Sequence, residues 1–516
     1  MAGDKRVAKV DLNGKPFHFI GIGGIGMSAL AYIVAQRQLP VSGSDLRSSH
    51  ITDRLETLGV KFFPSQLASN LDFFNNVSVE KPQPLPVSAG VQPEIAESIS
   101  NINQVDNLPQ VVCSTAIAKT NPEYQAAIKL GCPIFHRSDL LAALIEQYQS
   151  IAVSGTHGKT TTSSLIGYML FACDLDPTII VGGEVDAWDG NARSGQGQYL
   201  VAEADESDGS LVKHHPSIGV ITNIELDHPD RYQDIQEVIG IFQTFASQCN
   251  TLIGCIDDPI IREELALTIS YSLDPDLGAD YTAQNVSYHS QGSNAEIWSR
   301  GVCLGELELP MLGEHNLSNA LAAIAVGRQA GLKFNTIAQS LTTFGGTKRR
   351  FEHRGEVNNI IFIDDYAHHP SEIEVTLAAG KLRVAGNNSL QRVVAIFQPH
   401  RYSRTHTFLT EFAEAFQTAD VVVITDIYSA GEKNIYGISG GDLVKEIARQ
   451  SAGGVPPLEG TVEGALKHKN VHYHASVDSI ADFLQQQILQ PGDLAMFLGA
   501  GNLNQSIPKT IALYQH

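Results

Sequence analysis

Short apolar runs that each end in glycine or polar residues recur along the whole chain. Residues 17–20 and 150–153 each lead into a glycine-rich stretch, and residues 393–397 end in a run of polar and basic side chains. Segments with helical patterning separate these runs, so the pattern predicts strands that alternate with helices. Such alternation is typical of open, mostly parallel α/β sheets, which bind ligands at the carboxyl ends of their strands.

The same pattern divides the chain into three parts, and its 516 residues suit about three domains. We predict an α/β fold with a Rossmann-like N-terminal domain over 1–148, a central P-loop ATPase-like domain over 149–346 and a Rossmann-like, doubly wound C-terminal domain over 347–516. The proline-rich residues 78–110 are predicted to form an inserted loop. Residues 268–309 alternate and are rich in β-formers, which predicts a small antiparallel accessory sheet.

Composition narrows the classes of partner. The chain has 35 basic and 56 acidic residues, a net charge of −21, which argues against nonspecific binding to nucleic acid or to an anionic membrane. An anionic substrate would need locally focused positive charge. Six scattered cysteines without a Cys-x-x-Cys pair fit reduced thiols. The N-terminus has no apolar signal core and no run reaches membrane-spanning length, so we expect a soluble, cytoplasmic protein.

The central glycine-rich stretch carries the strongest chemical signal. Strand, glycine loop and helix together direct backbone N–H groups and a helix N-terminus at phosphate oxygens. Lys159 would add a positive charge on the outer phosphates, and the Thr160 hydroxyl would hold Mg²⁺. Val153 stands where the full P-loop pattern has glycine, so the match is partial, but a simple helix-capping turn would need neither the lysine nor three threonines. The predicted phosphate-binding residues are Gly155, Thr156, His157, Gly158, Lys159, Thr160 and Thr161.

A second glycine motif opens the first domain. The G-x-G-x-x-G fingerprint lies between a short strand and a helix, and an acidic residue follows where a ribose-binding acid is expected. Small residues that end the strand 111–113, and a His-Arg pair after a further short strand, would face the same crevice. A surface arginine is the competing interpretation of that pair. The predicted ligand-binding residues are Gly21, Gly23, Gly24, Gly26, Asp45, Ser114, Thr115, Ala116, Ile117, His136 and Arg137.

Two further strand ends of the central domain carry candidate metal ligands. Glu203 ends an apolar strand, and a carboxylate there suits Mg²⁺ beside a triphosphate. A solvated acidic turn explains Glu206 and Asp208 well, but it does not explain Glu203 at the edge of an apolar strand. His228 follows a third strand and would be a metal ligand or a proton acceptor, although a lone histidine is more often structural.

Polar residues also end every predicted strand of the last domain. These polar segments are residues 364–370, 398–405, 426–432 and 499–502, and each directly follows an apolar run. Structural charges do not usually cluster at each carboxyl end of one sheet, so a binding crevice explains them better. Before this domain, Asn316 and Asn319 open an Ala-rich helix, where they would read an adenine edge; N-terminal capping accounts for one of them.

Taken together, these residues resemble the Mur ligase family, ATP-dependent amino-acid ligases of peptidoglycan synthesis. The resemblance covers nearly the whole chain apart from the 78–110 stretch, and the family's phosphate loop is of the short form. Its motifs lie, in order, at 21–26, 155–160, 202–208, 227–228, 315–319, 349–351, 364–370, 398–404 and 430–432.

The resemblance implies a role for each domain. The first would bind the UDP of UDP-N-acetylmuramate, the middle one ATP, and the last one the amino acid. Several family members carry a carbamoylated lysine shortly after the histidine that matches His228; no lysine occurs here between His228 and Asp257, which favours L-alanine as the amino acid.

The resemblance also implies roles for individual residues. Lys159, Glu203 and His228 would be catalytic, with Thr160, Glu203 and His228 organising Mg²⁺. Adenosine would be surrounded by Asn319, Arg350 and Asp365. The substrate carboxylates would lie near Tyr366, His369, His400, Arg401 and Arg404.

Other functions remain open at this point. A sister ligase that recycles muramyl tripeptide shares the fold and nearly the same motifs. A nicotinamide-dependent dehydrogenase would use the first glycine motif but leave Lys159, Glu203 and His228 without a role. A nucleotide-binding protein with a purely regulatory function is a third alternative, and the polar residues at the strand ends of the last domain argue against it. The sequence is compatible with a monomer or a dimer.

Overall fold

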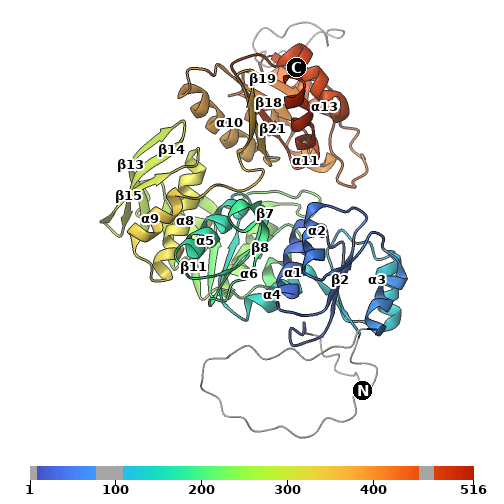
Figure 1. Ribbon diagram of the computed structural model, residues 1–516. Coiled ribbons are helices and arrows are strands. Elements are labelled where there is room, and N and C mark those ends of the chain that lie inside the picture. Colours follow the sequence, from blue (N-terminus) through green and yellow to red (C-terminus); the bar gives the residue numbers. More distant parts are fainter. Residues whose placement is uncertain (1–8, 77–107, 452–469, 516) are drawn as a thin grey trace, which may run out of the picture.

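The computed structural model describes residues 9–76, 108–451 and 470–515. These residues form three α/β domains, each built on its own sheet, that follow one another along the chain (Figure 1). The predicted inserted loop lies outside the described residues, except for 108–110 at its end.

The first domain is a five-stranded parallel sheet with helices on its faces. The strand order β3-β2-β1-β4-β5 reverses direction between β1 and β4, so the loops after these two strands border one crevice. The strands are β1 (Phe17–Ile20), β2 (Val41–Ser44), β3 (Lys61–Phe63), β4 (Gln110–Cys113) and β5 (Ile134–His136). The helices are α1 (Ile25–Gln36), α2 (His50–Thr57), the 3₁₀ segment η1 (Ala68–Asn76), α3 (Pro122–Leu130) and α4 (Arg137–Ile145).

The central domain is a ten-stranded sheet in the order β15-β14-β13-β12-β11-β10-β6-β9-β7-β8. The antiparallel strands predicted within 268–309 are present as β13–β15, but they extend the main sheet because β13 pairs in parallel with β12, Tyr281 beside Tyr271. The strands are β6 (Gln149–Ser154), β7 (Thr178–Val185), β8 (Gly190–Arg193), β9 (Tyr199–Glu203), β10 (Ile218–Ile221), β11 (Thr251–Cys255), β12 (Ile269–Ser272), β13 (Tyr281–His289), β14 (Gly292–Ser299) and β15 (Val302–Leu309). The helices are α5 (Lys159–Ala172), α6 (Ile235–Gln248), α7 (Pro259–Glu264), α8 (Glu314–Gln329) and α9 (Phe334–Thr342), with 3₁₀ turns η3 (Asp186–Trp188), η4 (Ser210–Lys213) and η5 (Pro275–Leu277).

The last domain is a six-stranded sheet in the order β16-β17-β21-β18-β19-β20, parallel except for β16. Its strands are β16 (Glu352–Val357), β17 (Ile360–Asp365), β18 (Arg392–Phe397), β19 (Val421–Ile424), β20 (Asn470–Tyr473) and β21 (Asp493–Leu498). Its helices are α10 (Pro370–Ala385), α11 (Tyr402–Thr407), α12 (Leu409–Ala415), α13 (Gly440–Ser451), α14 (Ile480–Phe483) and α15 (Ile507–Ala512), with short turns η6 (Val477–Ser479), η7 (Leu484–Ile488) and η8 (Leu503–Ser506).

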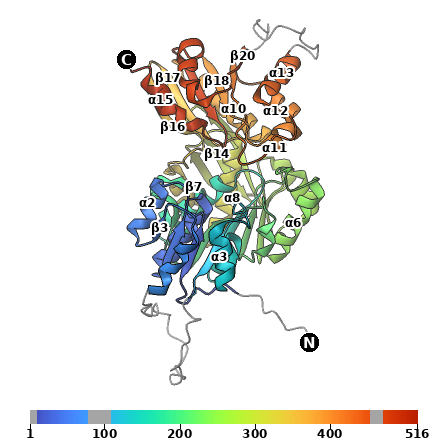
Figure 2. The same ribbon diagram turned by 90° about the vertical axis from the view of Figure 1, so that its right-hand side faces the viewer.

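The three domains are joined by two kinds of interface. Buried side chains of α1 and of β7 to β9, including Ile33, Ile180 and Leu200, form one apolar cluster that spans the first and central domains. The apolar clusters of the last domain contain, among the described residues, only residues of that domain. Figures 1 and 2 show this domain as a separate body that meets the others at one end. The first two domains therefore share a hydrophobic core, and the third does not.

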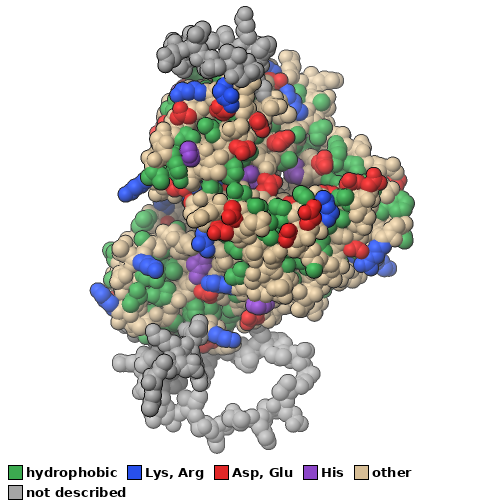
Figure 3. Space-filling model, turned by 180° about the vertical axis from the view of Figure 1, so that it is seen from behind, with side chains coloured by type: hydrophobic (Ala, Val, Ile, Leu, Met, Phe, Trp, Pro, Cys, Tyr) green, Lys and Arg blue, Asp and Glu red, His purple; other side chains and the backbone are tan. Residues whose placement is uncertain are grey.

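The described surface carries charges of both signs. Lys and Arg side chains lie scattered among Asp and Glu on the face seen from behind (Figure 3). None of the helices in the described part of the chain combines the length and the apolar character that crossing a bilayer requires.

Candidate active site

A cleft of about 870 Å³ lies where the three domains meet. It is lined from the first domain by Gly26, His50 and Arg137, from the central domain by Lys159, Thr160, Glu203, Asp205, Asp227 and His228, and from the last domain by Arg349, Arg350, Tyr366 and His368. A smaller cavity of about 220 Å³ adjoins it and is lined in part by Asn316, Asn319, Asp365 and Ser371. His157 and Gly158 line both cavities, so the central glycine loop lies between them.

The glycine loop between β6 and α5 is shaped by two residues with positive φ. Gly155 has φ +136°, and a Cβ there would lie 2.0 Å from the Thr222 hydroxyl oxygen; Gly158 has φ +78°. Neither position tolerates a side chain without strain. Asn223 anchors the loop, since its carbonyl accepts from the Thr156 N–H at 3.0 Å and its side chain accepts from the His157 N–H at 2.8 Å. The loop is therefore fixed against the end of β10.

Lys159 extends into this loop and is buried with a carboxylate. Its Nζ donates to the carbonyl oxygens of Gly155 (2.7 Å) and Thr156 (3.0 Å) and lies 2.8 Å from Glu206 Oε2. Glu206 is only 3% exposed, and burial raises the pKa of its carboxyl to about 7 although the Lys159 charge opposes this. The interpretation of Glu206 as part of a solvated turn is wrong, because the acidic segment after β9 folds inward onto the lysine.

The three predicted metal ligands, Thr160, Glu203 and His228, all line the cleft. Glu203 Oε2 accepts from the Gly182 N–H at 2.7 Å, and a Cβ on Gly182 would lie 2.6 Å from the carboxylate oxygens. Burial lowers the pKa of His228, although Asp227 opposes the shift, and the lowered pKa favours the neutral imidazole that binds metals. A hydroxyl, a carboxylate and a neutral imidazole at one cleft form a donor set that fits a divalent cation beside phosphates.

In the first domain, the predicted residues surround the crevice between β1 and β4. Asp45 Oδ2 accepts from the Gly23 N–H at 2.9 Å, and the Ile117 side chain lies 3.3 Å from the position of a Cβ on Gly21. The loops 21–26 and 114–117 are thus neighbours, as strand order requires.

The His136–Arg137 pair joins the first domain to the acidic segment of the central domain. Arg137 donates to Asp205 at 2.7 Å and to Asp208 at 3.3 Å, and its Nη1 lies 3.4 Å from the position of a Cβ on Gly26. His136 caps α4 and places Nε2 3.5 Å from Asp208. Arg137 is therefore a bridge between two domains, and not a free surface residue.

The smaller cavity contains the predicted adenosine residues, which differ in what they contact. Asn316 donates to the Leu312 carbonyl at 2.7 Å and does not cap α8, whose N-cap is Gly313; Asn319 accepts from the Thr162 hydroxyl at 3.0 Å. Asp365 accepts from the N–H groups of Phe351 (2.7 Å) and Ala367 (2.8 Å), and burial raises its pKa to about 6. Arg350 also lines this cavity, and its guanidinium carbon lies 5.3 Å from the centroid of the Tyr366 ring.

The predicted carboxylate-binding arginines are engaged with the central domain. Arg404 is 1% exposed and forms a two-pronged pair with Asp227, Nε to Oδ1 at 2.8 Å and Nη2 to Oδ2 at 3.0 Å. Arg401 donates to Asp230 at 2.9 Å and to Glu432 at 3.2 Å. Sequence reasoning did not find Asp227 or Asp230 as partners, because this pairing exists only once the last domain docks.

Of the five residues predicted near the carboxylates, only Tyr366 lines the large cleft. His400 stacks on Tyr428 with 5.7 Å between ring centroids, and burial lowers the pKa of His400 to about 2. His369 is 4% exposed and packs on the His157 ring with 4.7 Å between centroids. Their contact with substrate stays a prediction, whereas His368, not selected from the sequence, does line the cleft.

Comparison with known proteins identifies relatives over nearly the whole chain. Family models described as "Mur ligase family, catalytic domain", "Mur ligase middle domain" and "Mur ligase, glutamate ligase domain" match residues 16–149, 153–327 and 349–501. The UDP-N-acetylmuramate–L-alanine ligase of Gloeothece citriformis is 59% identical over 509 residues, 98% of this chain and 99% of the relative. That of Nostoc punctiforme is 60% identical over 505 residues, 98% of each chain.

Solved structures match the three-domain arrangement. The UDP-N-acetylmuramate–alanine ligase of Thermotoga maritima superposes with a TM-score of 0.75 at 26% identity, covering 97% of this chain and 99% of the other. A murein peptide ligase of Psychrobacter arcticus gives a TM-score of 0.66 at 21% identity, covering 97% and 98%. The second likeness concerns the fold alone.

The pair between Arg404 and Asp227 should couple the last domain to the central one. We expect a double-mutant cycle with Arg404→Met and Asp227→Asn to give a coupling energy of about 1–3 kcal/mol in urea unfolding, because each single change leaves a buried charge unpaired. The exposed pair Lys445–Asp442 within α13 serves as the control and should couple by less than about 1 kcal/mol. A coupling energy of zero for the buried pair would show that the domains do not dock in this way.

The cleft residue His214 should make stability depend on pH. Burial, and secondly the charge of Arg137, lowers the pKa of this 1% exposed imidazole to about 4. As the pH falls, His214 is therefore protonated in the unfolded chain at a higher pH than in the folded protein. Stability is therefore retained above about pH 6.5 and lost towards pH 4. When the pH is lowered from about 7.5 to about 5.5, the free energy of unfolding should fall by about 1 kcal/mol less in His214→Gln than in the unmodified protein. His406→Gln, at an exposed site, should not differ from it; equal losses in all three proteins would contradict the assignment.

Proposed function

This chain belongs to the Mur ligase family, and we propose that it joins L-alanine to the lactyl carboxylate of UDP-N-acetylmuramate in peptidoglycan precursor synthesis in the cytoplasm. ATP drives the reaction and leaves as ADP and phosphate. The observation that carries the proposal is identity of 59–60% over nearly full length to UDP-N-acetylmuramate–L-alanine ligases. The lysine-bearing loop at the junction of three domains supplies the matching chemistry.

Each domain contributes one part of the reaction. The crevice bordered by Gly21–Gly26 and Ser114–Ile117 holds the UDP portion, with Asp45 positioned at the glycine loop. The two central cavities hold ATP, with its phosphates on the Lys159 loop and adenosine near Asn319, Arg350 and Asp365. The muramyl carboxylate and alanine meet in the large cleft. Lys348, Arg349 and Arg350 line this cleft together with the phosphate loop.

The chemistry follows from the weak electrophilicity of a carboxylate. A carboxylate oxygen of the muramyl lactyl group attacks the γ-phosphorus of ATP, and the bond between that phosphorus and the β–γ bridging oxygen breaks. ADP departs, and the muramyl group is now an acyl phosphate. The neutral amine of alanine then attacks the acyl carbon, and the tetrahedral intermediate expels phosphate and loses a proton to give the amide. Lys159 neutralises negative charge on the transferring phosphoryl group, the main catalytic task in such transfers.

Thr160, Glu203 and His228 would hold Mg²⁺. When bound, Mg²⁺ supplies further charge neutralisation on the phosphates. Lys159 is the chain's own contribution to the same task. Its present partner, Glu206, must give way to phosphate oxygens when ATP binds, since the ammonium cannot contact both sets of acceptors with full geometry.

Closure of the last domain protects the intermediate. An acyl phosphate hydrolyses if water reaches it, so the cleft must be closed during the reaction. The last domain meets the others through polar pairs and shares no apolar cluster with them among the described residues. Such an interface can open and close at lower cost than the apolar interface between the first two domains.

The decisive experiment is phosphate release from ATP with UDP-N-acetylmuramate and a panel of amino acids and peptides. We expect turnover with L-alanine that requires all three substrates. The panel includes the muramyl tripeptide, because a tripeptide-recycling ligase would share this fold. Turnover with that tripeptide alone, and none with alanine, would overturn the proposal.

A further inference from the structure

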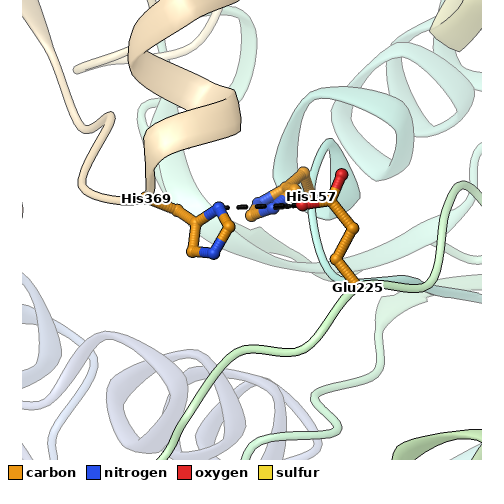
Figure 4. A group of neighbouring side chains, drawn as sticks. All are labelled: His157, Glu225 and His369. Atoms are coloured by element: carbon orange, nitrogen blue, oxygen red, sulfur yellow. Dashed lines mark ion pairs between the residues drawn. The ribbon is translucent and has the colours of Figure 1, made fainter. Parts of the chain in front are cut away.

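Three side chains from different segments converge at the boundary between the central and last domains (Figure 4). His157 comes from the phosphate loop, Glu225 from the segment after β10, and His369 from the residue before α10. One ligand atom from each lies within 4.8 Å of the other two. The cluster shares no residue with the set Thr160, Glu203 and His228.

The spacing of the ligand atoms matches a small tetrahedral site. Glu225 Oε2 lies 3.4 Å from His157 Nε2 and 3.7 Å from His369 Nδ1. Ligand atoms about 2.0–2.2 Å from a tetrahedral zinc ion stand about 3.3–3.5 Å apart. The two distances to Glu225 lie within a few tenths of an ångström of this spacing, and the two imidazole nitrogens lie within 4.8 Å of each other.

Three of the four imidazole nitrogens in this cluster form no hydrogen bond, although two of these three lie 3.4 and 3.7 Å from Glu225 Oε2. His369 is 4% exposed, and neither of its ring nitrogens forms a hydrogen bond; His157 Nε2 also forms none. Unlike His157, His369 does not line either cavity, so a substrate in these cavities does not satisfy it. Buried polar atoms are costly to leave unsatisfied, which calls for a partner at this point.

Neighbouring groups already orient two of the three ligands. The Ser371 hydroxyl donates to Glu225 Oε2 at 2.7 Å, and Glu372 Oε1 lies 3.3 Å from His157 Nδ1. A carboxylate on the far nitrogen of an imidazole fixes the tautomer that presents the other nitrogen to a metal. His157 Nε2 thus lies beside Glu225. Because, against the effect of burial, Glu225 and Glu372 raise the pKa of His157 to about 10, zinc displaces a proton from this nitrogen on binding.

We propose that His157, Glu225 and His369 form a zinc site that bridges the central and last domains. Two imidazoles and one carboxylate suit zinc, whereas Mg²⁺ prefers oxygen ligands. The site is separate from the Mg²⁺ site inferred for the ligase reaction. Because one ligand, His369, belongs to the last domain and two belong to the central domain, bound zinc fastens the domains together next to the phosphate loop.

Calorimetric titration of the full chain with Zn²⁺, in the presence of excess Mg²⁺ and without nucleotide, tests the proposal. We expect one equivalent to bind, and we expect His369→Ala and the isosteric Glu225→Gln each to weaken binding by more than about tenfold, since even outer-shell partners contribute that much. His406→Ala, which removes an exposed histidine of the same domain, should bind like the unmodified protein.

A spectroscopic readout does not depend on the variants. X-ray absorption of the zinc-loaded protein should show two imidazoles and oxygen ligands. The absence of stoichiometric binding, binding that survives both substitutions, or a spectrum without two imidazoles would overturn the proposal. Because no substrate is present, failure here leaves the proposed ligase activity untouched, and failure of the ligase assay leaves this site untouched.

Discussion

The structure depends on a buried cation held inside a tight glycine loop. Lys159 lines the cleft with 14% of its side chain exposed, and its ammonium is met by two loop carbonyls and the buried Glu206 carboxylate. The positive φ values of Gly155 and Gly158 bring those carbonyls round the ammonium, and Asn223 fixes the loop to the next strand. In the proposed reaction, phosphate oxygens replace Glu206 around Lys159. The loop conformation that this proposal requires is already formed by the chain itself.

The domain interfaces explain how such a site can open. The first and central domains share an apolar core that includes Ile33 and Leu200, and moving them apart would expose it. The last domain instead docks through Arg404 with Asp227 and through Arg401 with Asp230. Charged groups that separate on opening are rehydrated, which offsets much of the ion-pair energy that they lose, whereas newly exposed apolar surface gains no such compensation. The proposed domain closure therefore places the movement at the second interface and not at the first.

Local features of the sequence predicted much of the site. Both glycine loops follow strands because apolar runs and turn residues are adjacent in the chain, and strand order then places 21–26 beside 114–117. Features that depend on packing were missed. Glu206 resembles a solvent-exposed acid until the segment folds onto Lys159, and Arg404 resembles a free substrate ligand until it meets Asp227, 177 residues away. No sequence pattern predicts His369 beside His157, or β13 beside β12, because each contact joins separately folded segments.

The most direct measurement concerns the lysine itself. We expect Lys159→Ala to abolish alanine-dependent phosphate release and to remove calorimetrically detectable binding of a nonhydrolysable ATP analogue, while binding of UDP-N-acetylmuramate stays within about threefold, a difference below about 1 kcal/mol. Lys129→Ala, at an exposed position of α3, is the matched control. If Lys159→Ala weakened both ligands equally, or left the ATP analogue bound as before, the buried lysine would not be the phosphate anchor of this site.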